Sequence, residues 1–180
     1  EAARLERMVS DLLDLGRPLA PRFQSVDLAG LASDCVTVLL ARHECENVAM
    51  VVEKPDDRLL AEIDPDLVEL ALFNVIRNAA QASPAGGRVV VRVEGRGERV
   101  ALMVDDEGGG FPEEEALRLF EPFFTTRATG TGIGLAVVRR VVEANQGAIE
   151  IGRSPEGGAR LTMIFRAGET NPSEPPGGGA

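Results

Sequence analysis

The stretch PDLVELALFNVIRNAAQAS, residues 65–83, decides how the rest of the chain is interpreted. It predicts one long helix that is apolar on almost every side, with a proline at its first turn. Asn74 and Asn78 are four residues apart, so they lie on one side of that helix. Burying an unpaired amide costs about 1–3 kcal/mol, so both amides need partners. Their oxygens suit Mg²⁺ beside a triphosphate; the alternative is a pair of structural asparagines bonded to a nearby loop.

The segments on both sides of this helix predict a mixture of helices and strands. Alternating patterns over 87–95 and 98–106 predict a β-hairpin, and Asp27 is a favourable N-cap for a helix over 27–44. The other predicted elements are an amphipathic helix at 1–16, strands at 47–54 and 58–64, a short helix at 112–120, a helix at 132–146, and strands at 148–154 and 158–166. This order predicts an α+β fold, a two-layer sandwich with a mixed, mostly antiparallel sheet covered by helices on one face.

The composition excludes several classes of protein. The formal net charge is −10 and no basic cluster stands out, which argues against a nucleic-acid partner. No apolar run approaches the ~20 residues of a membrane span and no signal peptide is recognisable. We expect a cytoplasmic location and no membrane contact for this fragment, with a parent protein that is either soluble or membrane-anchored. Cys35 and Cys45 match no common zinc spacing, and we interpret them as reduced core cysteines.

A glycine-rich loop precedes the predicted helix at 132–146. In TTRATGTGIGLAVVRR, residues 125–140, three glycines stand at alternate positions. No lysine follows them, which excludes a Walker A loop, and no strand precedes them, which excludes a dinucleotide-binding turn. Helix N-terminal amides beside glycine form an anion site, and a flexible linker that caps the helix is the alternative.

An acidic turn follows the predicted strand at 98–106. The stretch VDDEGGGF, residues 104–111, places Asp105 and Asp106 at a strand end before three glycines. A carboxylate there can accept a hydrogen bond from an exocyclic amine such as that of adenine, and glycines leave room for a flat base. An ordinary acidic turn is the alternative.

Taken in order, these blocks resemble the ATP-binding catalytic domain of sensor histidine kinases, in the superfamily shared with gyrase, MutL and the heat-shock ATPase chaperone. The resemblance covers about residues 22–166. Its blocks are an N box DLVELALFNVIRNAAQAS, a first glycine box DEGGG, an F box LFEPFFTTR, a second glycine box GTGIGLAVV and a final strand EGGARLTMIF. Residues 1–18 are similar to the end of the dimerisation and phosphotransfer hairpin. We therefore expect a catalytic domain at 19–167 and, because hydrophobes are lacking, a disordered tail at 168–180.

The resemblance implies a role for each matching residue. Asn78 is the expected principal Mg²⁺ ligand, with Asn74 assisting, and these two are the expected catalytic residues. Asp106 is expected to accept from the adenine amino group, with Gly108 and Gly110 shaping the pocket. The other residues implied to hold ATP are Arg77, Phe120, Thr126, Arg127, Gly130, Thr131, Gly132, Ile133, Gly134 and Leu135.

The same resemblance implies a mobile lid from about Gly110 to Thr131. Phe120, Phe123 and Phe124 are its expected anchors. Arg127 stands where Lys is usual and keeps the charge needed to reach a phosphate.

Two departures bear on affinity and chemistry. Glu107 stands where Asn, Thr or Asp is frequent, and its negative charge near the nucleotide is expected to weaken affinity. Asn74 occupies the position at which hydrolysing members of the superfamily carry a water-activating Glu. An amide cannot act as a base, so the resemblance implies ATP held for transfer rather than for hydrolysis.

The resemblance implies a two-component sensor kinase that passes the ATP γ-phosphate to a histidine and then to a response-regulator aspartate. The single histidine, His43, follows the helix that an acceptor motif should precede, so we interpret it as a surface residue and place the acceptor elsewhere. The chain does not begin with Met, and we expect a fragment of a homodimeric parent, inactive in autophosphorylation without its dimerisation domain. A module that senses ATP without transfer, and an anti-sigma-type serine kinase, are the alternatives.

Overall fold

The computed structural model describes residues 16, 19–111, 118–125 and 131–169. All but the last residue of the predicted helix at 1–16, most of the predicted helix at 112–120 and nearly all of the predicted tail lie outside the described residues. No helix in the described ranges has the length and apolar character that crossing a membrane requires.

The larger sheet has five strands in the order β2–β4–β5–β7–β6. Its strands are β2 (Ala49–Glu53), β4 (Arg88–Arg96), β5 (Arg99–Asp106), β6 (Ala148–Arg153) and β7 (Ala159–Arg166). β2 runs parallel to β4, and the other pairings in this sheet are antiparallel. The predicted mixed, mostly antiparallel sheet is confirmed, as is the hairpin of β4 and β5.

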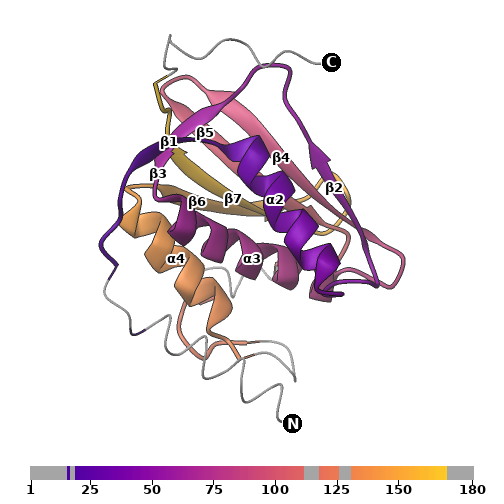
Figure 1. The fold of residues 1–180 in the computed structure, drawn as a ribbon. Helices are drawn as coiled ribbons and strands as arrows, with labels where there is room; N and C mark the ends of the chain where they lie inside the picture. The colour runs from indigo at the N-terminus through magenta and orange to yellow at the C-terminus, as the bar shows by residue number, and fades with distance from the viewer. Residues whose placement is uncertain (1–15, 17–18, 112–117, 126–130, 170–180) are drawn as a thin grey trace.

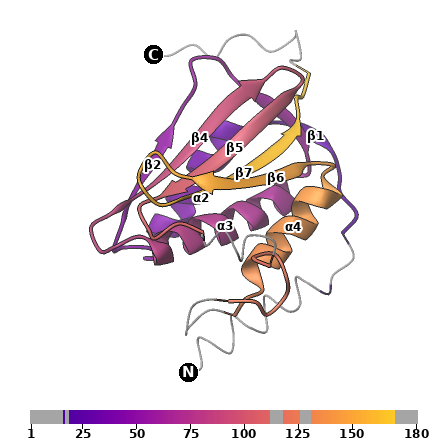
Figure 2. The ribbon, with the colours of Figure 1, turned by 180° about the vertical axis from the view of Figure 1, so that it is seen from behind.

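The helices α2 (Leu28–Ala41), α3 (Pro65–Ala82) and α4 (Gly134–Ala144) form the second layer. They lie on one face of the five-stranded sheet, and the view from behind shows its other face, which we call the outer face (Figures 1 and 2). α3 is the central helix, because it packs against both α2 and α4. The predicted two-layer sandwich is therefore confirmed.

A separate two-stranded sheet pairs β1 (Gln24–Asp27) antiparallel to β3 (Leu60–Ile63). β3 was predicted, but β1 was not, because its four residues QSVD run directly into the start of α2. The N–H of Gly168 donates to the carbonyl of Leu60 at 2.8 Å. The first residue of the predicted tail is thus bonded to this small sheet.

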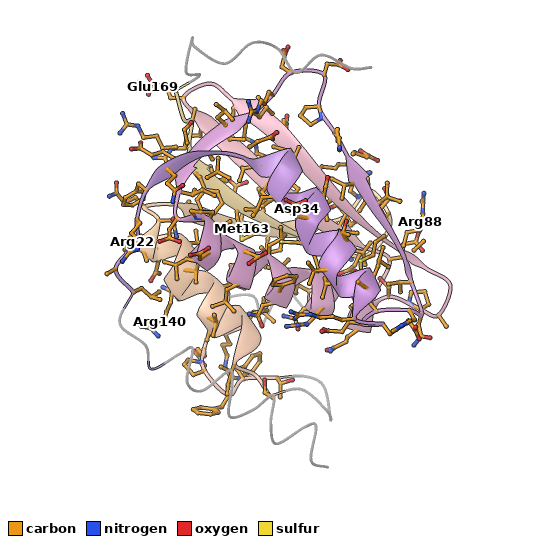
Figure 3. The ribbon with its side chains drawn as sticks, in the orientation of Figure 1. Arg22, Asp34, Arg88, Arg140, Met163 and Glu169 are labelled. Atoms are coloured by element: carbon orange, nitrogen blue, oxygen red, sulfur yellow. The ribbon has the colours of Figure 1, made fainter. Side chains whose placement is uncertain are left out.

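Alternation along the central strands sends one set of side chains toward the helices. Met163, for example, is fully buried between β7 and the helical layer (Figure 3). Each such side chain contributes about 1.5–3 kcal/mol by leaving water. The core residues from β4, β5 and β7 are Val89, Val91, Val93, Val100, Leu102, Val104, Leu161, Met163 and Phe165.

The start of α2 is as predicted, whereas its end comes earlier. Asp27 caps the helix, and its Oδ1 accepts from two backbone amides of the first turn. The predicted helix runs to residue 44, but α2 ends at Ala41 because His43 and Cys45 have φ values of 55° and 69°. A helix cannot continue through residues in the left-handed region.

Both cysteines are free thiols. Cys35 is fully buried in α2, and this burial raises the pKa of its thiol to about 12, so it stays protonated. Cys45 is half-buried after α2, and burial raises its pKa as well. The structure confirms them as reduced, partly or fully buried core cysteines.

Asp64 joins three segments at the start of α3. Its carboxylate accepts from the N–H of Leu67 at 3.1 Å, which caps α3, and from the N–H of Arg22 at 2.7 Å. Its own N–H donates to Oδ1 of Asn145, the residue that follows α4, at 2.7 Å. The other end of the Asn145 amide donates to the carbonyl of Val141 at 2.9 Å. α3 and α4 are therefore fixed to each other through one buried amide.

Replacing this amide is expected to destabilise the domain. Asn145→Ala leaves the buried N–H of Asp64 without an acceptor, which costs about 1–3 kcal/mol. Urea unfolding measures the loss, with Asn47→Ala as control, because Asn47 is exposed. Equal unfolding midpoints for Asn145→Ala and the unchanged chain would contradict this role.

Candidate functional site

α3 carries the first pair of candidate site residues, Asn74 and Asn78. A Cβ placed on Gly134, the first residue of α4, would lie 3.1 Å from Oδ1 of Asn74 and 3.6 Å from Nδ2 of Asn78. Nδ2 of Asn74 donates to the carbonyl of Leu70 at 3.0 Å, which leaves its oxygen on the α4 side. Asn78 is half-buried, and its side-chain amide forms no hydrogen bond with any residue in the described ranges. Asn74 thus presents a hard oxygen ligand beside a helix start, and the side-chain amide of Asn78 lies next to it.

The start of α4 offers backbone amides. Ile133 is the N-cap residue of α4, and no side chain forms a capping hydrogen bond with the first turn of this helix. The N–H of Ile133 makes only a long contact, 3.4 Å, with Oγ1 of Thr131. Gly132 has a φ of 68°, and a Cβ there would lie 2.5 Å from the backbone of Phe123. Glycine is therefore required for the turn that aims these amides, and the helix dipole favours an anion in front of them.

The segment before the glycine turn is held against it by its backbone. The N–H of Phe123 donates to the carbonyl of Gly132 at 2.9 Å, while its own ring is 63% exposed. Phe120 packs against the hydrophobic core, and the guanidinium of Arg118 lies 4.3 Å from the ring centre of Phe124. Of the expected lid anchors, Phe120 makes the contact with the core.

Asp106 at the end of β5 is held by three backbone groups. Its Oδ1 accepts from the N–H of Gly108 at 2.8 Å and from that of Ala159 at 2.9 Å. Its carbonyl accepts from the N–H of Gly158 at 3.0 Å. Oδ2 receives no hydrogen bond from a residue in the described part of the chain. One oxygen thus fixes the carboxylate, and the other is available to an incoming donor.

Glycines on both sides bring the chain close to this carboxylate. A Cβ on Gly158 would lie 2.1 Å from Oδ1 of Asp106, and one on Gly108 would lie 2.6 Å from the carbonyl oxygen of Ala82. Gly110 has a φ of 80°. The contact of Gly108 with Ala82 places the acidic turn at the end of α3, about two helical turns, or roughly 12 Å, beyond Asn74.

Asp105 serves a different purpose from its neighbour. It is fully buried on the outer face of the sheet, where Arg160 donates to both its oxygens at 2.6 and 2.8 Å and Arg92 also pairs with it. The hydrogen bond to Asp105 raises the pKa of Arg160. Successive residues of a strand point to opposite faces, so only Asp106 faces the candidate site.

Glu107 does not bring an uncompensated charge to the site. Its carboxylate accepts from the N–H of Arg88 at 3.1 Å and from Nε of the same residue at 3.0 Å. This hydrogen bond raises the pKa of Arg88. The expected penalty from Glu107 on nucleotide affinity is therefore offset by an arginine that lies far away in the sequence.

The other predicted site residues fall into three groups. Ile133 is fully buried and Leu135 packs against the core, so either can reach a ligand only through its backbone. Arg77 donates to both carboxylate oxygens of Glu44 and lies over the ring of Phe73. The remaining predicted residues, Thr126, Arg127 and Gly130, lie outside the described residues.

One residue beside Asp106 received no role from the sequence. Gly158 lies against the carboxylate and cannot carry a Cβ without displacing it. The Gly-Gly pair directly before the last strand was a visible signal in the sequence. The contact of Gly158 with Asp106 could not be predicted from it, because the two residues are 52 positions apart and are brought together by the pairing of β5 with β7.

His43 lies at the surface. Its side chain is 81% exposed and contacts Glu46 through Nδ1. The interpretation of His43 as a surface residue at a helix end is confirmed.

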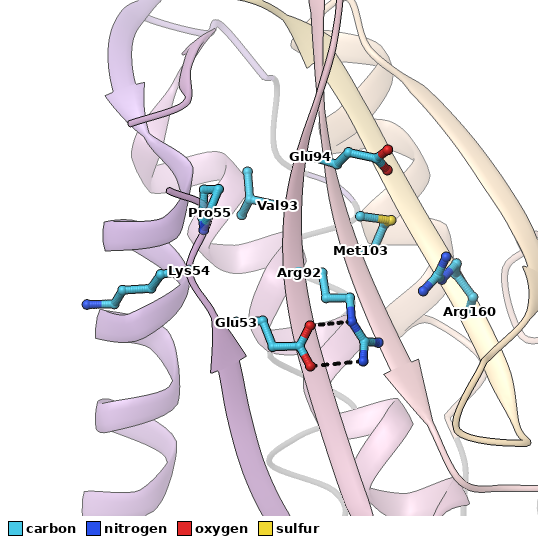
Figure 4. A pocket seen from close by; sticks show the side chains of 8 residues that line it. All are labelled: Glu53, Lys54, Pro55, Arg92, Val93, Glu94, Met103 and Arg160. Atoms are coloured by element: carbon cyan, nitrogen blue, oxygen red, sulfur yellow. Dashed lines mark hydrogen bonds and ion pairs between the residues drawn. The ribbon is translucent and has the colours of Figure 1, made fainter. Parts of the chain in front are cut away.

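A shallow pocket of about 320 Å³ lies on the outer face, away from Asn78 and Asp106. Its arginines, Arg92 and Arg160, lie next to Met103 and Glu94, and Arg92 is paired with Glu53 (Figure 4). Since Arg160 is also paired, with Asp105, neither guanidinium is left to bind a phosphate. The polar groups between α3 and the start of α4 therefore form the better candidate site.

An amide oxygen, helix-start amides and one directed carboxylate are groups that suit a nucleotide. A family model described as "Histidine kinase-, DNA gyrase B-, and HSP90-like ATPase" matches residues 63–169, and the chain belongs to this family. The match spans α3, the acidic turn, α4 and the last two strands.

Relatives within this family are sensor kinases. The chain is 35% identical to sensor histidine kinase ZraS of Escherichia coli O157:H7 over 163 residues, which are 91% of this chain and 36% of the relative. The solved catalytic domain of histidine kinase ThkA superposes with a TM-score of 0.72 at 25% identity, covering 81% of this chain and 95% of that one. Full-length ShkA in complex with AMPPNP gives 0.73 at 28% identity, covering 92% and 37%.

The chain therefore carries the ATP-binding catalytic domain of a two-component sensor histidine kinase. It spans about a third of the length of the ZraS relatives.

The glycines of the acidic turn provide a matched test of the site. Gly108→Ala forces a Cβ against Ala82, an overpacking that costs about 1–3 kcal/mol and displaces the turn. Gly109→Ala meets nothing within 4 Å and should be neutral. We expect weaker ATP binding and a lower thermal midpoint for the first variant only, in titration and melting experiments. Equal behaviour of the two variants would contradict the packing of this turn on α3.

Proposed function

We propose that this domain holds Mg-ATP and transfers the γ-phosphate to a histidine of a dimerisation and phosphotransfer domain in its parent protein. A response-regulator aspartate then takes the phosphate. The observation that carries the proposal is Asn74, whose oxygen lies beside the start of α4. An amide has no basicity with which to activate water, so ATP is kept intact until an acceptor arrives.

Asn78 is the residue best suited to hold Mg²⁺, with Asn74 next to it. Its amide lacks a hydrogen-bond partner among the described residues, and its oxygen is a hard ligand. No cluster of His, Cys, Asp or Glu in those residues could hold a metal by itself. Phosphate and water oxygens would complete the coordination of the ion. When bound, the ion neutralises charge on the transferring phosphoryl group.

The start of α4 is suited to the phosphates and Asp106 to the base. Gly134, at the start of α4, lies beside the Asn pair, and the predicted Thr126, Arg127 and Gly130 would add contacts from the lid. Oδ2 of Asp106 can accept from the amino group of adenine. Guanine presents a carbonyl at the equivalent position, which would repel the carboxylate, so ATP is preferred over GTP.

Labelled ATP tests the proposal in the complete parent kinase. After incubation with γ-labelled ATP and Mg²⁺, the label should be found on the protein as an acid-labile, alkali-stable phosphate, which is the behaviour of phosphohistidine. Acid-stable label would indicate a serine kinase, free phosphate without a phosphoprotein would indicate a hydrolase, and bound ATP without either would indicate a sensing module. Each of these three results would overturn the proposal.

A further inference from the structure

The turn between β6 and β7 holds the carboxylate of Asp106. Ala159, the first residue of β7 directly after this turn, donates to Oδ1, and Gly158 in the turn donates to the carbonyl of the same aspartate. The turn is closed on itself, because the N–H of Ser154 donates to the carbonyl of Gly158 at 3.0 Å and the N–H of Gly157 donates back to the carbonyl of Ser154 at 3.0 Å. Any shift of the turn therefore moves the donors that orient Asp106.

Glu156 fastens the tip of this turn to β4. One carboxylate oxygen accepts from Nη2 of Arg88 at 2.6 Å, and the other accepts from Nη2 of Arg92 at 2.8 Å. The side chain of Glu156 is only 11% exposed. Charge-assisted bonds of this length in a shielded position are among the strong ones in proteins.

The same two arginines also hold both sequence neighbours of Asp106. Arg92 pairs with Asp105, and Arg88 pairs with Glu107. Burial lowers the pKa of Arg92, but hydrogen bonds to Glu53, Glu156 and Asp105 outweigh it and raise the pKa overall, so the guanidinium stays charged. The end of β5 and the β6–β7 turn are thus joined through one charged network on the outer face.

We propose that Glu156 is a positioning residue for adenine recognition: its bonds to Arg88 and Arg92 hold the β6–β7 turn so that Oδ2 of Asp106 points at the base. It reaches no nucleotide itself and acts through Ala159 and Gly158. This inference rests on base recognition by Asp106, which is part of the proposed function, but it does not depend on where the phosphate is transferred.

Equilibrium titration of this chain with Mg-ATP, Mg-GTP and Mg-tripolyphosphate tests the inference without any acceptor. Glu156→Gln keeps the shape and removes the charge, and we expect ATP binding to weaken about five- to tenfold, as for a misdirected hydrogen bond to a charged group. Binding of tripolyphosphate, which has no base, should be unchanged, so the preference for ATP over GTP should narrow. Glu98→Gln, on the exposed β4–β5 turn, is the control and should change nothing.

Arg88→Gln removes one of the two arginines from β4 and provides a second variant. It also leaves Glu107 without its partner, so we expect ATP binding to weaken at least as much as in Glu156→Gln. A purely structural role for Glu156 would lower ATP and tripolyphosphate binding together, and that result would overturn the inference. Unchanged ATP binding in Glu156→Gln would overturn it as well. A failure of histidine phosphorylation in the parent kinase would leave these binding ratios unaffected, so the two proposals fail separately.

Discussion

Asn78→Ala is expected to abolish Mg-dependent ATP binding and leave the fold intact. The substitution removes the amide oxygen best suited to the ion. Mutating a residue that only hydrogen-bonds to a metal ligand typically lowers metal affinity 10- to 100-fold, and the loss of a direct ligand should exceed this effect. We therefore expect an affinity loss of about 100-fold or more. The fold should be unaffected, because the side chain of Asn78 bonds to no described residue and Ala is a better helix former.

Calorimetric titration with ATP in Mg²⁺ and in EDTA measures this effect. Asn47→Ala is the matched control, since it makes the same change on an exposed loop. A variant that loses equal affinity in Mg²⁺ and in EDTA, or one that keeps its affinity, would show that Asn78 does not hold the ion.

Asp106→Asn is expected to remove the preference for adenine. The two amides of Gly108 and Ala159 donate to Oδ1, so they force the new side chain to keep its oxygen there. Its NH₂ group then replaces Oδ2 and faces the adenine amino group, donor against donor. A lost hydrogen bond to a charged group corresponds to about a 10- to 100-fold loss of ATP affinity.

Parallel titrations with ATP and GTP measure this second effect. Asp57→Asn, on an exposed loop, is the control. GTP affinity should rise in Asp106→Asn, because the new NH₂ group can donate to the guanine carbonyl that the carboxylate repels, so the ratio of ATP to GTP affinity should fall to one or below. A variant that still prefers ATP by the original ratio would remove Asp106 from base recognition.

The fold could be predicted where local pattern and tertiary structure agree. The apolar helix around Asn74 and the alternating hairpin of β4 and β5 were predicted within a few residues of their bounds. β1 was not, because four residues give no usable period and Asp27 also signals a helix start. The early end of α2 depends on left-handed residues at His43 and Cys45, types that carry no strong turn signal.

The site could be predicted in part from spacing. That Asn74 and Asn78 share one side follows from helical geometry, but that this side faces Gly134 follows only from the packing of α3 on α4. Strand alternation separates Asp105 from Asp106, yet the sequence does not say which face of the strand the helices cover.

The arginine partners of the acidic residues near the site could not be predicted from the sequence. Glu107 was expected to weaken affinity, but Arg88, from the start of β4, pairs with it because β4 and β5 are antiparallel neighbours. The bond from Glu156 to the same arginine depends on β7 lying beside β5. Such contacts come from strand order, which a pattern of single residues does not contain.

A nucleotide site between α3 and the start of α4 is tested most directly by paramagnetic broadening in ¹⁵N-labelled chain, with Mn²⁺ in place of Mg²⁺. Adding Mn-ATP should broaden the side-chain amides of Asn74 and Asn78 and the backbone amide of Gly134, and should leave Glu98 sharp. Broadening centred on Arg92 and Arg160 at the outer-face pocket, with Asn78 unaffected, would contradict the site.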